Sequence, residues 1–105
     1  MTQVNIYRGR TTVLPVSLSY DVSNDVITSE IRVARNPTAE LIATWTVDYK
    51  TDGTDGELIL TLDDVITAQI TETLGYMDIK RITAGEPVPV FDDPIQVVFK
   101  DSVTA

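Results

Sequence analysis

The sequence predicts an all-β domain, an immunoglobulin-like Greek-key β-sandwich of seven to eight strands with at most one short helix. The β-branched residues Thr, Val and Ile are abundant, and they suit a pleated, half-buried surface. Short apolar stretches recur along the chain with turn residues between them, a spacing typical of sandwiches and barrels. Within these stretches apolar and polar residues alternate, as they do in strands that place one face in a core.

The strands follow from this alternation and from the turn residues that separate them. The clearest one runs from Leu41 to Tyr49 and is centred on Trp45. Residues 50–56 contain two Asp-Gly pairs, which indicate a hairpin loop into the next strand. Prolines confine residues 88–91 to the edge of a sheet, because proline has no amide hydrogen to donate. Strands are expected at residues 4–7, 12–20, 26–35, 41–49, 57–62, 76–82, 88–91 and 95–100.

Residues 63–73 are the one stretch with helical spacing of apolar positions. Asp63 or Asp64 can cap such a helix, since a carboxylate accepts from the free amides of the first turn. The stretch is short and rich in threonine, which limits the helix to a turn or two. Gly75 is expected to end it or to permit a positive-φ turn into the next strand.

The chain has 105 residues, which fits one domain over residues 1–105. No apolar run approaches the ~20 residues that cross a membrane, and no basic and apolar leader opens the sequence. We therefore expect a protein that is made and stays in the cytoplasm unless it leaves within a larger particle. The net charge of −8 repels phosphate backbones and anionic lipids, so neither nucleic acid nor membrane is expected as a partner.

The residue types needed for catalysis are scarce. Histidine and cysteine are absent, which removes the commonest general base, the thiol nucleophile and the best zinc ligands. No serine stands in a Gly-x-Ser-x-Gly turn, and no glycine-rich phosphate loop is present. We therefore expect neither an enzyme nor a cofactor.

The carboxylate pairs Asp63-Asp64 and Asp92-Asp93 could act in catalysis, form turns and helix caps, or bind calcium. Neighbours in a strand point to opposite faces, so adjacency alone does not make a working pair. We interpret these residues as turn and cap residues. A calcium site that also uses Asp52 and Asp55 stays open, although residues 52–57 lack the spacing of the twelve-residue calcium loop.

Trp45, Arg8 and Arg10 each allow a structural and a functional interpretation. Trp45 lies in the middle of the best strand and is expected in the core, while the alternative is an exposed platform that stacks on sugars. Arg8 and Arg10 flank Gly9 near the start of the chain. They are expected to be solvated, or to anchor an interface, because arginine is enriched at protein contacts.

Five segments of the chain stand in a recognisable order: Ile6-Tyr7-Arg8-Gly9-Arg10-Thr11, Ile31-Arg32-Val33, residues 56–62, Leu74-Gly75-Tyr76-Met77-Asp78-Ile79 and residues 95–104. In the order and spacing of these segments the chain resembles a group of small bacteriophage structural domains that includes the N-terminal domain of phage baseplate upper proteins. The resemblance spans residues 6–104. Arg10 stands where that group has Asp in its opening Gly-Asp-Thr, and Asp93-Pro94 replaces the glycine before its last strand.

The resemblance implies a β-sandwich and a non-enzymatic role in virion assembly, as an adaptor or cement in the tail, neck or baseplate. Its partners would be other virion proteins, in a multi-copy or homo-oligomeric arrangement, and its location the virion. A capsid decoration protein and a carbohydrate-binding module are the alternatives. The N-terminal strand to Arg10, the edge at residues 87–91 and the tail at 101–105 are the expected contact elements. The residues we expect at the interface are Tyr7, Arg8, Arg10, Val88, Val90 and Phe91.

Overall fold

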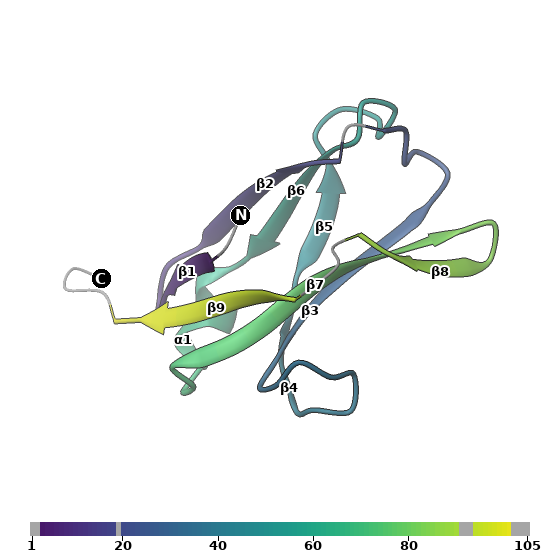
Figure 1. Ribbon diagram of the computed structural model, residues 1–105. Coiled ribbons are helices and arrows are strands. Elements are labelled where there is room, and N and C mark those ends of the chain that lie inside the picture. Colours follow the sequence, from purple (N-terminus) through teal and green to yellow (C-terminus); the bar gives the residue numbers. More distant parts are fainter. Residues whose placement is uncertain (1–2, 19, 91–93, 102–105) are drawn as a thin grey trace.

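Two β-sheets packed face to face make up the fold (Figure 1). The computed structural model describes residues 3–18, 20–90 and 94–101. The larger sheet has six strands in the order β1-β9-β7-β3-β4, with β8 paired to β7, and the smaller sheet has the order β2-β6-β5. The elements are β1 (Gln3–Tyr7), β2 (Thr12–Ser17), β3 (Val26–Arg32), β4 (Leu41–Thr44), β5 (Thr46–Tyr49), β6 (Glu57–Leu62), α1 (Asp64–Ala68), β7 (Leu74–Thr83), β8 (Glu86–Pro89) and β9 (Ile95–Lys100).

The predicted immunoglobulin-like sandwich is confirmed. β1 runs parallel to β9, and every other strand pair is antiparallel. The chain crosses between the sheets from β1 to β2, from β2 to β3, from β4 to β5 and from β6 to β7. This connectivity places β9, β7, β3 and β4 against β2, β6 and β5, as in a variable-type immunoglobulin domain.

The described residues form nine strands rather than seven or eight because the expected strand 41–49 divides at Trp45. β4 pairs with β3 in the larger sheet, whereas β5 pairs with β6 in the smaller one. The Trp45 amide still donates to the Ser29 carbonyl at 2.9 Å, and the indole is buried at the crossing point. A buried tryptophan thus joins the two sheets where the alternation alone showed a single strand.

Alternation predicted the core faces of β6 and β7 correctly, but not that of the strand expected at residues 41–49, where Leu41 alternates in step with the buried Ala43 and Trp45 and is itself exposed. On β6 the side chains of Leu58, Leu60 and Leu62 are fully buried, and the intervening residues are half-buried. On β7 Met77 and Ile79 point inward, while Tyr76 and Asp78 share the outer face. The other buried apolar residues are Val4, Ile6, Val16, Val22, Ile31, Ala43, Trp45, Ile70, Ile95, Val97 and Phe99.

The prediction for the helical segment is confirmed, whereas the prediction for Gly75 is wrong. Helix α1 has one short turn, and Asp63 is its N-cap, accepting from the Ile66 amide at 2.9 Å as predicted for Asp63 or Asp64. Gly75 neither ends that helix nor adopts a positive φ; it lies within β7. A Cβ at this position would meet Ile31 Cγ2 at 2.9 Å and Ile42 Cδ1 at 3.0 Å. Close packing, rather than a turn, accounts for this glycine.

β8 and β9 lie one after the other along the same side of β7 (Figure 1). The first part of β7 pairs with β9 and its last part with β8. The Val90 amide donates to the Ile79 carbonyl at 3.1 Å, just after β8 ends. β8 has β7 as its single partner strand among the described residues, so the proline-bearing segment is an edge, as predicted, although it begins at Glu86.

Candidate functional site

The predicted interface residues near the N-terminus have unequal roles. Tyr7 is the last residue of the edge strand β1, and the residue is 43% exposed. Arg8 is largely covered and binds other parts of the chain: its Nε donates to the Ile70 carbonyl at 2.8 Å and Nη2 donates to the Glu72 carbonyl. Its Nη1 forms an ion pair with Asp101 at 2.9 Å. Arg8 therefore fastens β1 to the segment before β7 and to the end of β9.

Arg10 is exposed in the turn after β1. Its amide donates to the Tyr7 carbonyl at 3.2 Å, and its own carbonyl accepts from Thr67 Oγ1 at 2.8 Å. Thr67 is the one buried residue of α1, so this contact attaches the turn to the helix. Gly9, between the two arginines, has a φ of 79°.

The second predicted group lies at the other end of the larger sheet. Val88 belongs to β8 and Val90 follows it, whereas Phe91 falls outside the described residues. Tyr7 is aligned with Lys100 at the far end of β9 from β8. The two groups therefore do not form one continuous surface. Of the predicted C-terminal contact element only Asp101 is described, and it pairs with Arg8.

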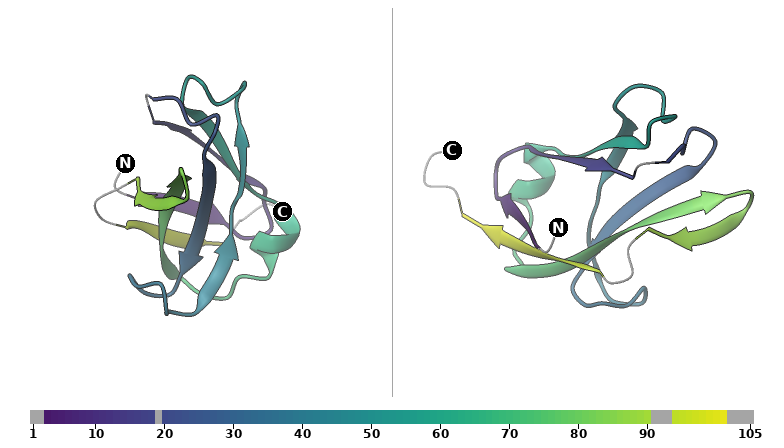
Figure 2. Two further views of the ribbon diagram at one scale, coloured as in Figure 1. Left: turned by 90° about the vertical axis from the view of Figure 1, so that its right-hand side faces the viewer. Right: turned by 45° about the horizontal axis from the view of Figure 1, so that its top comes forward.

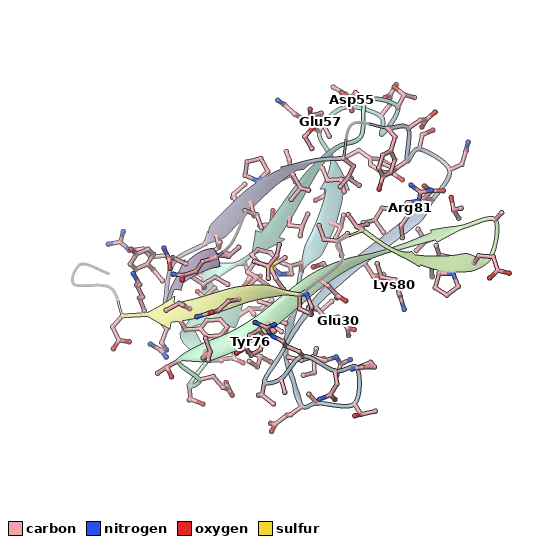
Figure 3. All side chains as sticks on the ribbon, viewed as in Figure 1. Glu30, Asp55, Glu57, Tyr76, Lys80 and Arg81 are labelled. Atoms are coloured by element: carbon pink, nitrogen blue, oxygen red, sulfur yellow. The ribbon has the colours of Figure 1, made fainter. Side chains whose placement is uncertain are left out.

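A groove that the sequence did not predict lies on the outer face of the larger sheet. It encloses about 320 Å³, and its floor is formed by β3 and β7. Figure 3 shows Glu30, Tyr76 and Lys80 along this pair of strands. Its lining residues are Thr28, Glu30, Arg32, Ala34, Arg35, Asn36, Pro37, Tyr76, Met77, Asp78, Ile79, Lys80, Pro87 and Pro94.

Mixed charges and one aromatic ring define this groove. The Arg35 guanidinium, from the loop between β3 and β4, lies 4.8 Å from the centre of the Tyr76 ring. Asp78 stands directly opposite Glu30, a placement in which like charges repel. Arg32 Nη2 pairs with Glu30 at 3.2 Å and offsets part of this repulsion. Such a surface can take a polar, peptide-like segment through ion pairs and stacking on the ring.

A second set of polar contacts holds the segment before β3 against the sandwich. Arg81 Nε lies 3.1 Å from Asp25 Oδ2, an ion pair without hydrogen-bond alignment, and its guanidinium is 4.7 Å from the Tyr20 ring centre. The Tyr49 hydroxyl lies within hydrogen-bond distance of the Val22 and Asp25 carbonyls, at 3.0 and 3.1 Å. The Asp25 side chain is 8% exposed. These contacts fix residues 20–25 against β5 and β7.

Asp52 and Asp55, which were considered as calcium ligands, accept hydrogen bonds within their own loop. Asp52 Oδ1 accepts from the Thr54 hydroxyl at 2.6 Å and from its amide at 3.0 Å. Asp21 binds Ser23 in the same way, and Asn36 binds Thr38. Within the described residues no three acidic side chains converge on a possible ion site, and Asp92 and Asp93 lie outside this range. The side chains act as turn residues, as interpreted from the sequence.

These local hydrogen bonds also shift two ionisations. The backbone amide of Ser23, followed by its hydroxyl, lowers the pKa of Asp21 below the usual 3.8. The Thr54 hydroxyl, followed by the Thr54 amide, lowers the pKa of Asp52 below 3.8. Both shifts arise because hydrogen-bond donors stabilise the charged carboxylate.

Trp45 belongs to the core, with 3% of its surface exposed. A sugar platform requires an accessible aromatic face, so a carbohydrate-binding role based on Trp45 is wrong. The indole Nε1–H has no hydrogen-bond partner among the described residues. Packing at the crossing between the sheets, rather than a polar contact, therefore positions this side chain.

Charge differs between the segment that runs from β5 to α1 and the groove on the larger sheet. From β5 through the start of α1 the chain carries Lys50 as its one basic residue. The groove on the other sheet carries three basic residues, Arg32, Arg35 and Lys80, and two acidic ones. Figure 3 shows Asp55, in the loop between β5 and β6, and Glu57, at the start of β6, well away from Lys80. The acidic residues of the segment from β5 to α1 are Asp48, Asp52, Asp55, Glu57, Asp63 and Asp64.

Comparison with known protein families and with curated proteins gives no match to any family model or any curated sequence. Within residues 3–18, 20–90 and 94–101, no helix is both long enough and apolar enough to span a membrane.

The groove was missed because it depends on which strands are neighbours. Alternation along residues 76–79 puts Tyr76 and Asp78 on one face of their strand and Met77 and Ile79 on the other, and the structure confirms this. It did not show that β3 lies beside β7, or that the loop carrying Arg35 folds over the pair. The alternating polar residues of β3 and β7 were the available signal.

Proposed function

We propose that this chain is a non-enzymatic structural protein of a bacteriophage virion, an adaptor or cement in the tail, neck or baseplate that binds two unlike neighbours. The observation that carries this proposal is the difference in charge between two parts of the sandwich. The segment from β5 to the start of α1 carries six acidic residues and one basic residue, whereas the groove on the larger sheet is lined by three basic and two acidic residues. Two surfaces of different charge suit two different partners, because charge complementarity selects the partner and its orientation.

Weak contacts suffice for this role when copies are repeated in a symmetric particle. Each additional contact in a closed ring acts at high effective concentration, so modest affinities sum to firm attachment. The resemblance of residues 6–104 to small phage structural domains supports the same role. The rigid immunoglobulin-like frame presents both sides in a fixed geometry.

Location and copy number in purified particles test this proposal directly. Cryo-electron microscopy and quantitative mass spectrometry would be applied to particles of the phage that encodes the chain. Copies in small rings at the tail, neck or baseplate support an adaptor. Copies on the shell, on the order of tens to hundreds, would establish capsid decoration instead. Absence from every particle would overturn the virion role.

Charge reversals on the two sides test the division between partners. Asp48→Lys alters the acidic segment, and Lys80→Glu alters the groove. Each variant serves as the control for the other, because both residues are exposed strand positions. We expect each to lose a different neighbour in cross-linking mass spectrometry of assembled particles. Loss of the same neighbour from both variants, or of none, would contradict a two-sided adaptor.

A further inference from the structure

The free edges of the two sheets are not equally protected against pairing with another chain. Natural edge strands are guarded by proline, charge, bulges or short length. β2 contains Pro15, and β8 contains Pro87 and Pro89. β4 has four residues and a register shift beside it, and β5 has four residues including Asp48. β1, with the sequence Gln-Val-Asn-Ile-Tyr, has none of these features apart from its modest length of five residues.

Among the described residues β9 is the one strand that pairs with β1, so the backbone of β1 presents an open ladder on its other, outer side. The Arg8 amide donates to the Lys100 carbonyl at 2.9 Å, which fixes the side that faces β9. Backbone groups alternate along a strand, so Val4 and Ile6 also bond toward β9. The amides and carbonyls of Gln3, Asn5 and Tyr7 therefore point away from the sheet. The Tyr7 carbonyl also accepts from the Arg10 amide, which leaves it a second lone pair.

We propose that β1 is a self-association edge, where it pairs antiparallel with β1 of a second copy across a two-fold axis at Asn5. In this register Asn5 faces its own copy, Gln3 faces Tyr7, and Val4 faces Ile6. Gln3, Asn5 and Tyr7 direct their backbone groups outward, so they form three hydrogen-bonded residue pairs with the second copy. Each such pair exchanges two bonds, which gives about six backbone hydrogen bonds across the interface. The larger sheets of the two copies then become one continuous sheet.

The second copy is the favoured occupant because the strand is complementary to itself. β1 has no charged residue, so no like charges meet across the axis, although each molecule carries a net charge of −8. On the outer face the exposed Tyr7 ring covers the Gln3 side chain of the other copy, and Gln3 already bonds to Asn5 at 2.8 Å. On the inner face Val4 and Ile6 continue the core. An isologous contact of this kind closes as a dimer.

This inference rests on the proposed function only for its biological setting, since pairing would raise the valency of the adaptor. Particle location tests the role, and the experiments below test the pairing in solution. A β1-paired dimer of a protein absent from particles would overturn the role and leave the pairing intact.

Single-cysteine variants of the full chain give a test of the register, because the chain has no cysteine. In the proposed pair the two Asn5 Cα atoms lie about 5.5 Å apart, within disulfide range. The two Gln3 Cα atoms are offset by four residues along the strand, about 14 Å. We expect Asn5→Cys to form an oxidised dimer at least about tenfold faster than Gln3→Cys, its matched control on the same exposed face.

Mixtures of two cysteine variants, and variants of opposite charge at Asn5, give a second test of the register. Gln3→Cys and Tyr7→Cys should cross-link to each other far better than either does to itself. Asn5→Lys and Asn5→Glu should each be monomeric by sedimentation equilibrium, while their mixture forms a heterodimer. Circular dichroism would verify that each variant is folded. Equal cross-linking of Asn5→Cys and Gln3→Cys, or a wild-type chain that stays monomeric at all concentrations while Asn5→Cys forms no dimer, would overturn the pairing.

Discussion

The Arg8 side chain links the end of β1 to two segments that are distant from it along the chain. Its guanidinium contacts two carbonyls in the segment before β7 and the carboxylate of Asp101 after β9. The planar group presents several donors in fixed directions, which suits three acceptors on two separate segments. The sequence marked Arg8 as a solvated or interface residue because no local pattern shows acceptors that are distant along the chain.

Replacing Arg8 by alanine should lower the free energy of unfolding by about 1–3 kcal/mol, because two carbonyls lose a charged donor. Arg8→Lys should fall between alanine and wild type, since an ammonium group cannot reach all three acceptors. Urea denaturation followed by the fluorescence of Trp45 measures these changes. The exposed Lys100→Ala is the control, with a change within about 0.5 kcal/mol. Equal effects of Arg8→Ala and Lys100→Ala would refute the fastening role.

Asp52 should titrate with a midpoint below 3.8, because the Thr54 hydroxyl and amide stabilise its carboxylate. Thr54→Val removes the hydroxyl, so the Asp52 midpoint should rise toward 3.8. Since the folded pKa is the lower one, this stabilisation is present above pH 3.8 and is lost as the pH falls through the folded pKa. NMR titration of the carboxyl carbons measures both midpoints. The Asp21 midpoint, lowered by Ser23, should stay low in the variant, and an unmoved Asp52 midpoint would contradict the assignment.

At the scale of elements, two residues determine how strands meet. Trp45 divides an alternating run into β4 and β5, which belong to different sheets. Gly75 allows β7 to approach the side chains of Ile31 and Ile42 closely. Both are packing effects between segments distant in sequence. Periodicity therefore gave the faces of these strands but not the division at Trp45 or the reason for Gly75.

Gly75→Ala should destabilise the fold by about 1–3 kcal/mol through overpacking, because its Cβ would lie 2.9 Å from Ile31 Cγ2 and 3.0 Å from Ile42 Cδ1. Ile42→Val removes Cδ1, so the double variant should recover part of the loss. A double-mutant cycle from urea denaturation gives this coupling energy. Additive effects of the two substitutions would show that the proposed contact with Ile42 is not the cause.

At the scale of the whole molecule, the first and last described strands are neighbours. β9 lies between β1 and β7, and it brings Ile95, Val97 and Phe99 into the core. The right view of Figure 2 shows β1 (purple) and β9 (yellow) side by side at one end of the sandwich. Closure of the larger sheet therefore depends on the end of the chain, and the fold is formed largely by pairing of distant segments.

A chain that stops after Pro94 should not fold cooperatively, because β1 loses its partner strand and β7 loses the pairing of its first part. Three buried apolar side chains would be lost with β9, each worth roughly 1.5–3 kcal/mol, which together approach or exceed the stability of a small domain. Thermal unfolding followed by circular dichroism and by Trp45 emission compares it with the full chain. A sharp transition with buried tryptophan emission in the truncated chain would disprove this dependence.

The sequence by itself determined the fold class, the residues that face the core in β6 and β7, the hairpin between β5 and β6, the cap of α1 and the proline-bearing edge. These features depend on local alternation, turn chemistry and backbone hydrogen bonding, which neighbouring residues encode. The tertiary structure alone decided the internal contacts of Arg8, the division at Trp45, the groove across β3 and β7 and the exposed outer side of β1. Each of these features depends on segments that are far apart along the chain. The periodicity of the sequence shows which face of a strand is buried, but it does not show which strands pair.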